Sequence, residues 1–239
     1  MEKRSEIVDW SLGETPSLSE QAAHVLREAI LNEVFKPGEK LVERTLADQT
    51  GVSRTSIREA LSKLEAEGLI TRVQGRGMYV SLLSESEARA IYEARAILES
   101  AMARMFVERA DDADLAALDK AVDQAERTDH PENAREHARD LDEVFQVITR
   151  GAGNEVTGQM ASILRTRVTY LRTITSRVAS AERRVESIRF LREIRAAMKS
   201  RDGDRAEELI RGYVERSAAF AVKVLSTINN KDPHSEEKG

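Results

Sequence analysis

Three side chains that can read the edges of base pairs lie close together in the first third of the chain. Arg54, Thr55 and Arg58 fall within five positions, so a helix would carry them on neighbouring parts of one face. An arginine fork can donate two hydrogen bonds to O6 and N7 of a guanine, and a threonine hydroxyl can contact a base edge or a phosphate. Arg44 precedes this group and Arg76 follows it. The pattern predicts contact with double-stranded DNA.

The elements that must position these arginines follow from the residues around them. Gly51 can take the left-handed conformation that ends a helix, and Ser53 can cap the helix predicted over Arg54–Glu67. A shorter helix is predicted over Leu41–Thr50, before the turn. The second helix should bury an apolar stripe formed by Ile57, Ala60, Leu61 and Leu64.

A glycine-tipped hairpin is predicted directly after these helices. Alternating residues over Leu69–Val73 and Met78–Leu82 predict two short strands, and the turn between them carries Gly75 and Arg76. Glycines let a backbone approach a duplex closely, and an arginine can enter the narrow minor groove. Together with a first helix over Leu18–Val34, these elements make up a winged helix-turn-helix.

The remaining pattern predicts a mostly α-helical chain in two domains. The winged helix-turn-helix, α-helical with a small β-hairpin wing, should occupy residues 18–82. Residues 86–228 should form an all-α bundle of about six helices that binds an effector and dimerises. We expect residues 1–17 to be a flexible tail and residues 229–239 to be a polar tail.

The composition is typical of a soluble, helix-rich protein. Hydrophobic residues make up 41% of the chain, and no apolar run reaches the roughly 18 residues of a membrane helix. The N-terminal residues lack the apolar stretch of a signal peptide, so we expect a cytoplasmic protein with no membrane partner. The net charge of −5 arises outside residues 18–81, which carry nine basic and nine acidic side chains.

The residue types give no support to an enzyme. The chain has no cysteine, which excludes disulfides and thiolate metal sites. No Ser/His pairing at motif spacing, no phosphate-cradling loop and no metal triad can be recognised, so we do not expect catalysis. The histidines are each expected at the surface: His24, His130, His137 and His234.

The segment PGEKLVERTLADQTGVSRTSIREALSKLEAEGLITRVQGRGMYV closely resembles the winged helix-turn-helix of the GntR family of bacterial regulators. The resemblance implies that Arg44, Arg54 and Arg58 make the main major-groove contacts, and that Gly75 of the wing approaches the minor groove. It also implies a homodimer on a short, two-fold symmetric operator. The predicted DNA-binding set is Arg44, Ser53, Arg54, Thr55, Arg58, Gly75 and Arg76.

The C-terminal half is similar to the FCD-type sensor domain of the FadR subfamily, through YEARAILESAMARMFVERA, LDEVFQVITRGAGN and LREIRAAMKSRDGDRAEEL. Many such domains hold a divalent metal with one aspartate and three histidines. The resemblance places the aspartate at Asp142, whereas the histidine positions read Gln146, Leu191 and Tyr213. Leucine cannot ligate, and a phenol is a poor zinc ligand at neutral pH. We therefore predict no metal and no cofactor, with weak binding of a hard cation by Asp142 and Gln146 as the minor alternative.

Two oppositely charged stretches of the bundle leave two interpretations open. Residues 165–201 carry eleven basic and three acidic side chains, and residues 108–143 carry thirteen acidic and five basic ones. The helices can pack side by side and neutralise each other, or one or two arginines can point inward and bind an anionic ligand. The predicted effector-binding set is Arg95, Asp142, Gln146, Arg165, Arg172, Leu191 and Tyr213.

These observations predict a sequence-specific transcriptional regulator, a repressor, whose affinity for DNA changes when a small anionic organic effector binds in the bundle. The loss of three histidines should make the cavity less polar, which favours a carboxylate with an apolar body. The alternative is a ligand-independent DNA-binding protein that uses the bundle only to dimerise. A bundle without an internal cavity would favour that alternative.

Overall fold

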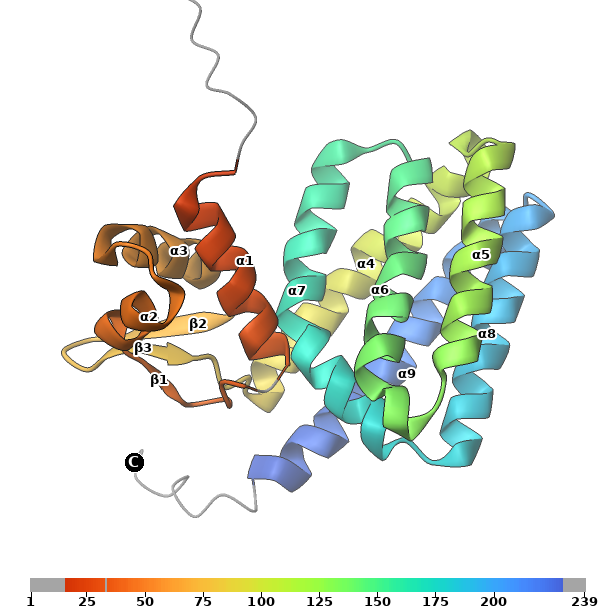
Figure 1. Cartoon of the computed structure of the whole chain (residues 1–239). Coiled ribbons are helices and arrows are strands. Elements are labelled where there is room, and N and C mark those ends of the chain that lie inside the picture. Colours follow the sequence, from red (N-terminus) through yellow and green to blue (C-terminus); the bar gives the residue numbers. More distant parts are fainter. Residues whose placement is uncertain (1–15, 33, 230–239) are drawn as a thin grey trace, which may run out of the picture.

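The structure, a computed structural model, describes residues 16–32 and 34–229. Two helical bodies, each with its own apolar core, lie side by side: residues 18–80 form the smaller one and residues 85–229 the larger one (Figure 1). Most of the two predicted tails lies outside the described residues, and so does His234.

Capping residues set the ends of the helices in the smaller body. Ser17 and Glu20 form a capping box at the start of the first helix. Gly51 ends the second helix with a left-handed φ of 72°, and the Ser53 hydroxyl accepts a hydrogen bond from the Ser56 backbone at the start of the third. Both predictions are confirmed. The helices are α1 (Leu18–Leu31), α2 (Glu43–Thr50) and α3 (Arg54–Ala66).

A three-stranded antiparallel sheet completes the smaller body, in the order β1-β3-β2. The strands are β1 (Lys40–Leu41), β2 (Ile70–Val73) and β3 (Gly77–Val80). The predicted helix start at Leu41 is wrong, because Leu41 is buried opposite Met78 in the sheet and the helix begins at Glu43. β2 and β3 form the wing, and their pairing runs from Ile70 opposite Val80 to Val73 opposite Gly77.

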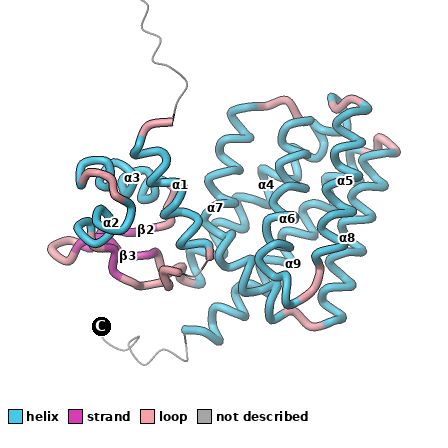
Figure 2. The backbone as a smooth tube through the Cα atoms, viewed as in Figure 1, coloured by secondary structure: helices cyan, strands magenta, loops and turns pink. Residues whose placement is uncertain are grey.

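The larger body is helical wherever the structure describes it, apart from the turns (Figure 2). Its described α-helices agree in number with the six predicted. They are α4 (Glu85–Arg109), α5 (Asp112–Thr128), α6 (Ala134–Gly151), α7 (Glu155–Val178), α8 (Ala181–Lys199) and α9 (Gly203–Asn229), with a 3-10 turn η1 (Pro131–Asn133) before α6.

The first and last helices of this body, α4 and α9, pack along each other, and α6 packs between α5 and α7. Their apolar faces share one core, which includes Phe106, Phe145, Leu171 and Leu191. At the surface, basic residues of α8 pair with acidic residues of α5, which confirms the interpretation that these helices neutralise each other. The pairs are Arg192–Glu126 (2.8 Å), Arg195–Asp123 (2.6 Å) and Lys199–Asp119 (2.7 Å).

The two bodies meet where α1 lies beside α7 (Figure 1). Glu28 of α1 accepts a hydrogen bond from Arg135 Nη2 of α6 at 2.7 Å. Residues 81–84 join the wing to α4. Within the described ranges, no helix combines the length and the apolar character that a membrane crossing requires.

Candidate functional site

The predicted DNA-reading residues of α3 lie on its solvent-facing side. Arg54, Thr55 and Arg58 are exposed, whereas Ile57 and Leu61 on the opposite side are buried in the core. Burial of this stripe fixes the rotation of α3 about its axis. The helix therefore presents its three candidate side chains together to an approaching duplex.

Two of the arginines are oriented by acidic residues of α2. Arg58 Nε donates to Oε2 of Glu43 at 2.7 Å, and Arg44 Nε lies 3.9 Å from Oδ2 of Asp48. The side chains of Arg58 and Arg44 are 66% and 77% exposed. Exposed pairs of this kind contribute only about 0–1 kcal/mol, so DNA oxygen atoms can replace the carboxylates.

The wing turn carries the other two candidates. Gly75 has a φ of 71°, and the Arg76 backbone N–H donates to the Val73 carbonyl at 3.0 Å. No atom outside the turn lies near the place of a Gly75 Cβ, so the requirement for glycine is the left-handed backbone. Arg76 is exposed at the tip of the wing.

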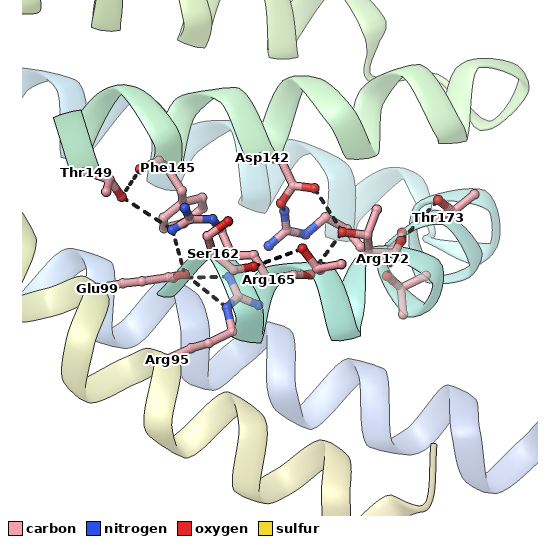
Figure 3. Close-up of polar contacts among 12 residues, drawn as sticks. Arg95, Glu99, Asp142, Phe145, Thr149, Ser162, Arg165, Arg172 and Thr173 are labelled. Carbon is pink, nitrogen blue, oxygen red and sulfur yellow. Dashed lines mark hydrogen bonds and ion pairs between the residues drawn. The ribbon is translucent and has the colours of Figure 1, made fainter. Parts of the chain in front are cut away.

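A fully buried arginine lies inside the larger body. Arg95 of α4 donates from Nε and Nη2 to both oxygens of Glu99, at 3.1 Å each, and both side chains are 1% exposed (Figure 3). Its guanidinium also lies over the Tyr92 and Phe145 rings. Burial lowers the pKa of Arg95, but Glu99, Tyr92 and Asp142 together more than offset this effect, so the pKa lies above its ordinary value. The remaining donor, Nη1, is buried without a hydrogen-bond partner.

Two arginines of α7 extend this network. Arg165 Nη1 lies 3.7 Å from Oε1 of Glu99, and Arg172 Nη1 donates to Asp142, which also accepts from the Thr169 hydroxyl at 3.2 Å. Three guanidinium groups therefore share two carboxylates, which leaves one positive charge in excess. Burial lowers the pKa of Arg165, because its charged form is poorly solvated there. A further anion would stabilise the network.

A hollow of about 540 Å³ opens beside this network, and Arg172 and Tyr92 are part of its wall. The rest of its wall comes largely from α7, α8 and α9, and includes Thr175, Ser176, Arg183, Arg184, Ser187, Tyr213, Ser217 and Phe220. This lining is more polar than the loss of three histidines predicts, because hydroxyl and guanidinium groups of three helices face the hollow. An anion with hydroxyl groups or an aromatic ring fits such a wall.

His137 is buried at the edge of the hollow, which corrects the prediction that every histidine lies at the surface. Its Nδ1 is 3.0 Å from the Ala125 carbonyl oxygen, and its Nε2 is 3.6 Å from Oδ1 of Asp129. Burial lowers the pKa of His137 and raises the pKa of Asp129. His24 and His130 are exposed, as predicted.

The structure separates the predicted effector residues into three places. Arg172 and Tyr213 line the hollow, and Gln146 and Arg165 line a separate open depression. Neither wall includes Arg95, Asp142 or Leu191. Arg95 contacts Tyr92 and Asp142 contacts Arg172, and both Tyr92 and Arg172 line the hollow.

The residues at the four implied metal positions do not fit a divalent ion. Asp142 is already bound by Arg172, Gln146 is exposed, and Leu191 is buried in the apolar core. The Tyr213 ring packs 5.7 Å from the ring of Phe145. Among the described residues, no three His, Asp or Glu side chains gather to hold a metal. The guanidinium of Arg172 takes the place beside Asp142 that a cation would need.

The sequence interpretation missed several residues of the hollow, among them Arg184, Ser217 and Phe220. One signal was present: Tyr213, Ser217 and Phe220 follow each other at helical spacing and share one face of α9. That face could not be assigned to a cavity without knowing which helices pack beside α9.

A capped recognition helix with exposed arginines, beside a glycine-tipped wing, defines a DNA-binding protein of the winged helix-turn-helix class. Residues 18–80 match the family described as "Bacterial regulatory proteins, gntR family", and residues 90–216 match the FCD domain. The chain therefore belongs to the GntR family of transcriptional regulators, with an FCD domain as its C-terminal half.

Relatives agree with this assignment. The HTH-type transcriptional regulator YdhC of Bacillus subtilis is 33% identical over 122 residues, which are 51% of this chain and 54% of YdhC. The Nta operon transcriptional regulator of Aminobacter aminovorans is 40% identical over 84 residues, 35% of this chain and 40% of that protein. The chain thus spans about half the length, or less, of these two relatives. The Escherichia coli repressor GlaR is 30% identical over 198 residues, 79% of this chain and 89% of GlaR.

Solved structures share the fold. Escherichia coli McbR/YncC superposes with a TM-score of 0.73 at 21% identity, over 88% of this chain and 99% of McbR. A GntR transcriptional regulator from Rhodococcus sp. RHA1 superposes with a TM-score of 0.75 at 19% identity, over 87% of this chain and 99% of that chain.

Proposed function

We propose that the chain is a ligand-responsive repressor, whose affinity for DNA changes when a small anionic organic molecule binds in the hollow of the bundle. The relative GlaR is named a repressor, which supports that direction of regulation. The hollow favours this function over the alternative in which the bundle serves only to dimerise.

The observation that carries the proposal is the excess of buried positive charge. Three arginines share two carboxylates, and Nη1 of Arg95 has no hydrogen-bond partner. Arg172 belongs to the wall of the hollow, so an anion bound there would add the negative charge that the three arginines lack. An effector with a negative charge is therefore better matched to this bundle than a neutral one.

The DNA contacts follow from the exposed face of α3 and from the wing. Arg54 and Arg58 reach base edges in the major groove, with Thr55 beside them. Arg44 binds at the phosphate rim, and Arg76 enters the minor groove. The Ser53 hydroxyl caps α3 and so holds the start of the helix against the backbone, while Gly75 lets the wing approach the duplex.

A homodimer on a two-fold symmetric operator requires a surface that a second copy can cover. Val156, Met160 and Ile163 follow each other at helical spacing on α7, and their side chains are 68%, 55% and 49% exposed. We assign the dimer contact to this row. Met160→Glu should shift the protein toward monomer in light scattering, whereas Val185→Glu, at a valine of α8 that is 70% exposed, should not.

The test of the effector combines binding with a DNA readout. Thermal unfolding is measured with a panel of carboxylates of differing size and polarity, and the stabilising compounds are then added to the protein bound to a duplex selected from a random library. Arg184→Gln should abolish both the stabilisation and the change in DNA affinity, because Arg184 lines the hollow. Arg189→Gln, an exposed arginine of the same helix, is the matched control.

Anionic compounds that stabilise both variants equally would overturn the assignment of the hollow. A protein that binds its selected duplex, but responds to no carboxylate, would support the dimerisation-only alternative.

A further inference from the structure

A second hollow lies between the two bodies of the protein, where residues of α1, the wing and the linker (residues 81–84) face residues of α7 and α9. The empty space between its walls, open solvent included, is about 680 Å³. Apolar side chains of both bodies line most of its wall, including Ile30, Leu69 and Val80 from the smaller body and Leu171, Ile174 and Leu225 from the larger one; Leu82 of the linker completes it.

One positively charged side chain, that of Arg167, is part of this mostly apolar wall. Arg167 of α7 lies across Gly68, which follows the C-cap residue of α3, and its Nη2 is 3.9 Å from Oε1 of Glu87. Its Nε is buried and has no hydrogen-bond partner. The side chain therefore offers one unsatisfied donor and a weakly paired charge to the hollow.

We propose that this hollow is a second ligand site, which takes a monocarboxylate with an apolar body. The carboxylate binds the guanidinium of Arg167, and the apolar body fills the space between Leu82, Leu171 and Ile174. The two hollows thus differ in the ligand that they match: the bundle hollow is rich in hydroxyl groups and arginines, and this one joins a long apolar wall to a single cation.

The position of the site gives its occupant an effect on DNA binding. A ligand here touches the smaller body through Ile30 and Leu69 and the larger one through Leu171, so it binds best to one arrangement of the two. Arg167 also covers Gly68 so closely that a Cβ there would lie 2.7 Å from its Nε, and drawing its guanidinium toward a carboxylate changes the packing just after α3. Occupancy therefore changes the orientation of the recognition helix relative to the bundle.

The test measures binding of decanoate, with decanol as the uncharged probe of equal chain length, by equilibrium dialysis on the full chain. Decanoate should bind saturably and at least about tenfold more tightly than decanol, which is the effect of one charge-assisted hydrogen bond. Arg167→Gln should remove that difference. Leu82→Asp, at a leucine that is 63% exposed, should weaken decanoate binding by repulsion without disturbing a core.

Two control variants separate this site from the bundle hollow. Arg184→Gln removes an arginine of the bundle hollow and should leave decanoate binding unchanged. Arg89→Gln, an exposed arginine of α4, should do the same. A photoreactive decanoate analogue should label peptides that contain Leu82 or Ile174.

Three results would overturn the proposal: labelling only of peptides from α8, equal binding of decanoate and decanol, or full binding by both Arg167→Gln and Leu82→Asp. Because Arg184→Gln tests the bundle hollow alone, failure of the second site leaves the proposed effector response standing, and the reverse also holds.

Discussion

Arginines are found at both candidate sites of this protein, but those of the winged domain are exposed to solvent and those of the bundle are buried. On α3 and α2, Arg58 and Arg44 are exposed and pair with carboxylates that water also reaches. In the bundle, Arg95 and Glu99 are each 1% exposed and bind each other with two hydrogen bonds. An exposed guanidinium can exchange its carboxylate for a phosphate or a base at little cost, whereas a buried one must keep a partner.

This difference shows what each region can sense. The exposed arginines can bind phosphates or base edges, and the contacts with base edges provide the selectivity. Under the proposed function, the buried network responds to a molecule that enters the hollow and adds negative charge beside Arg172. Variants that break one type of pair and not the other can test this comparison.

The largest effect is expected for the buried pair. Glu99→Gln leaves Arg95 and Arg165 without a charged partner, and the free energy of unfolding should fall by about 3–5 kcal/mol in urea titrations. The double change Arg95→Met with Glu99→Leu should recover part of that loss, because it removes one of the two unpaired charges and leaves that of Arg165. A double variant no more stable than Glu99→Gln would contradict the argument.

The recognition helix should show its effect in DNA binding and not in stability. Arg54→Ala should weaken binding to a selected duplex by about 1–3 kcal/mol, since one base contact is lost, and leave the unfolding midpoint in place. Fluorescence anisotropy measures the affinity, and Arg150→Ala, an exposed arginine of the bundle, is the control. If both variants bind the duplex equally, Arg54 makes no base contact.

A smaller effect is expected from the buried histidine. Because burial lowers the pKa of His137, the unfolded chain takes up a proton first as the pH falls below about 6.5. The free energy of unfolding should therefore decrease between about pH 6.5 and pH 5.5, by at most about 1.4 kcal/mol. Asp129 has a raised pKa and acts in the opposite direction as it gains its proton. His137→Gln should flatten the decrease, and an unchanged slope would show that His137 is accessible to solvent.

The smallest effect is expected for the exposed pair. Glu43→Gln removes the partner of Arg58, and the free energy of unfolding should change by less than about 1 kcal/mol. Affinity for the duplex should rise slightly, because a negative charge beside the recognition helix is lost. A destabilisation as large as that of Glu99→Gln would remove the distinction between the two regions.

The smaller body could be predicted closely from the sequence because its signals are local. Gly51, Ser53 and the buried stripe of α3 act on residues within a few positions, and each was assigned correctly. β1 was missed because it exists only through pairing with β3, which lies far along the chain. A two-residue strand has no pattern of its own.

The cavity of the bundle could be predicted only in part. The helix breaks were visible, and so were the arginines at 95, 165 and 172. Their partners were not, because Glu99 is acidic on a helix full of charges and nothing in its spacing marks it as buried. His137 was assigned to the surface because nothing in the spacing of its neighbours indicates that it is buried. Burial of a polar side chain depends on which helices pack around it, and sequence spacing along one helix does not contain that information.

The four residues between β3 and α4 limit how far the DNA-binding unit can travel. An extended chain spans at most about 3.6 Å per residue, so the tether reaches about 14 Å. In the proposed dimer, two such tethers cannot provide the roughly 34 Å of one extra turn of duplex. The winged domains can rotate on their tethers, but the two bundles of the proposed dimer limit how far apart the winged domains can lie. Operators whose half-sites are spaced one turn too far apart are therefore rejected by the half of the protein that never touches DNA.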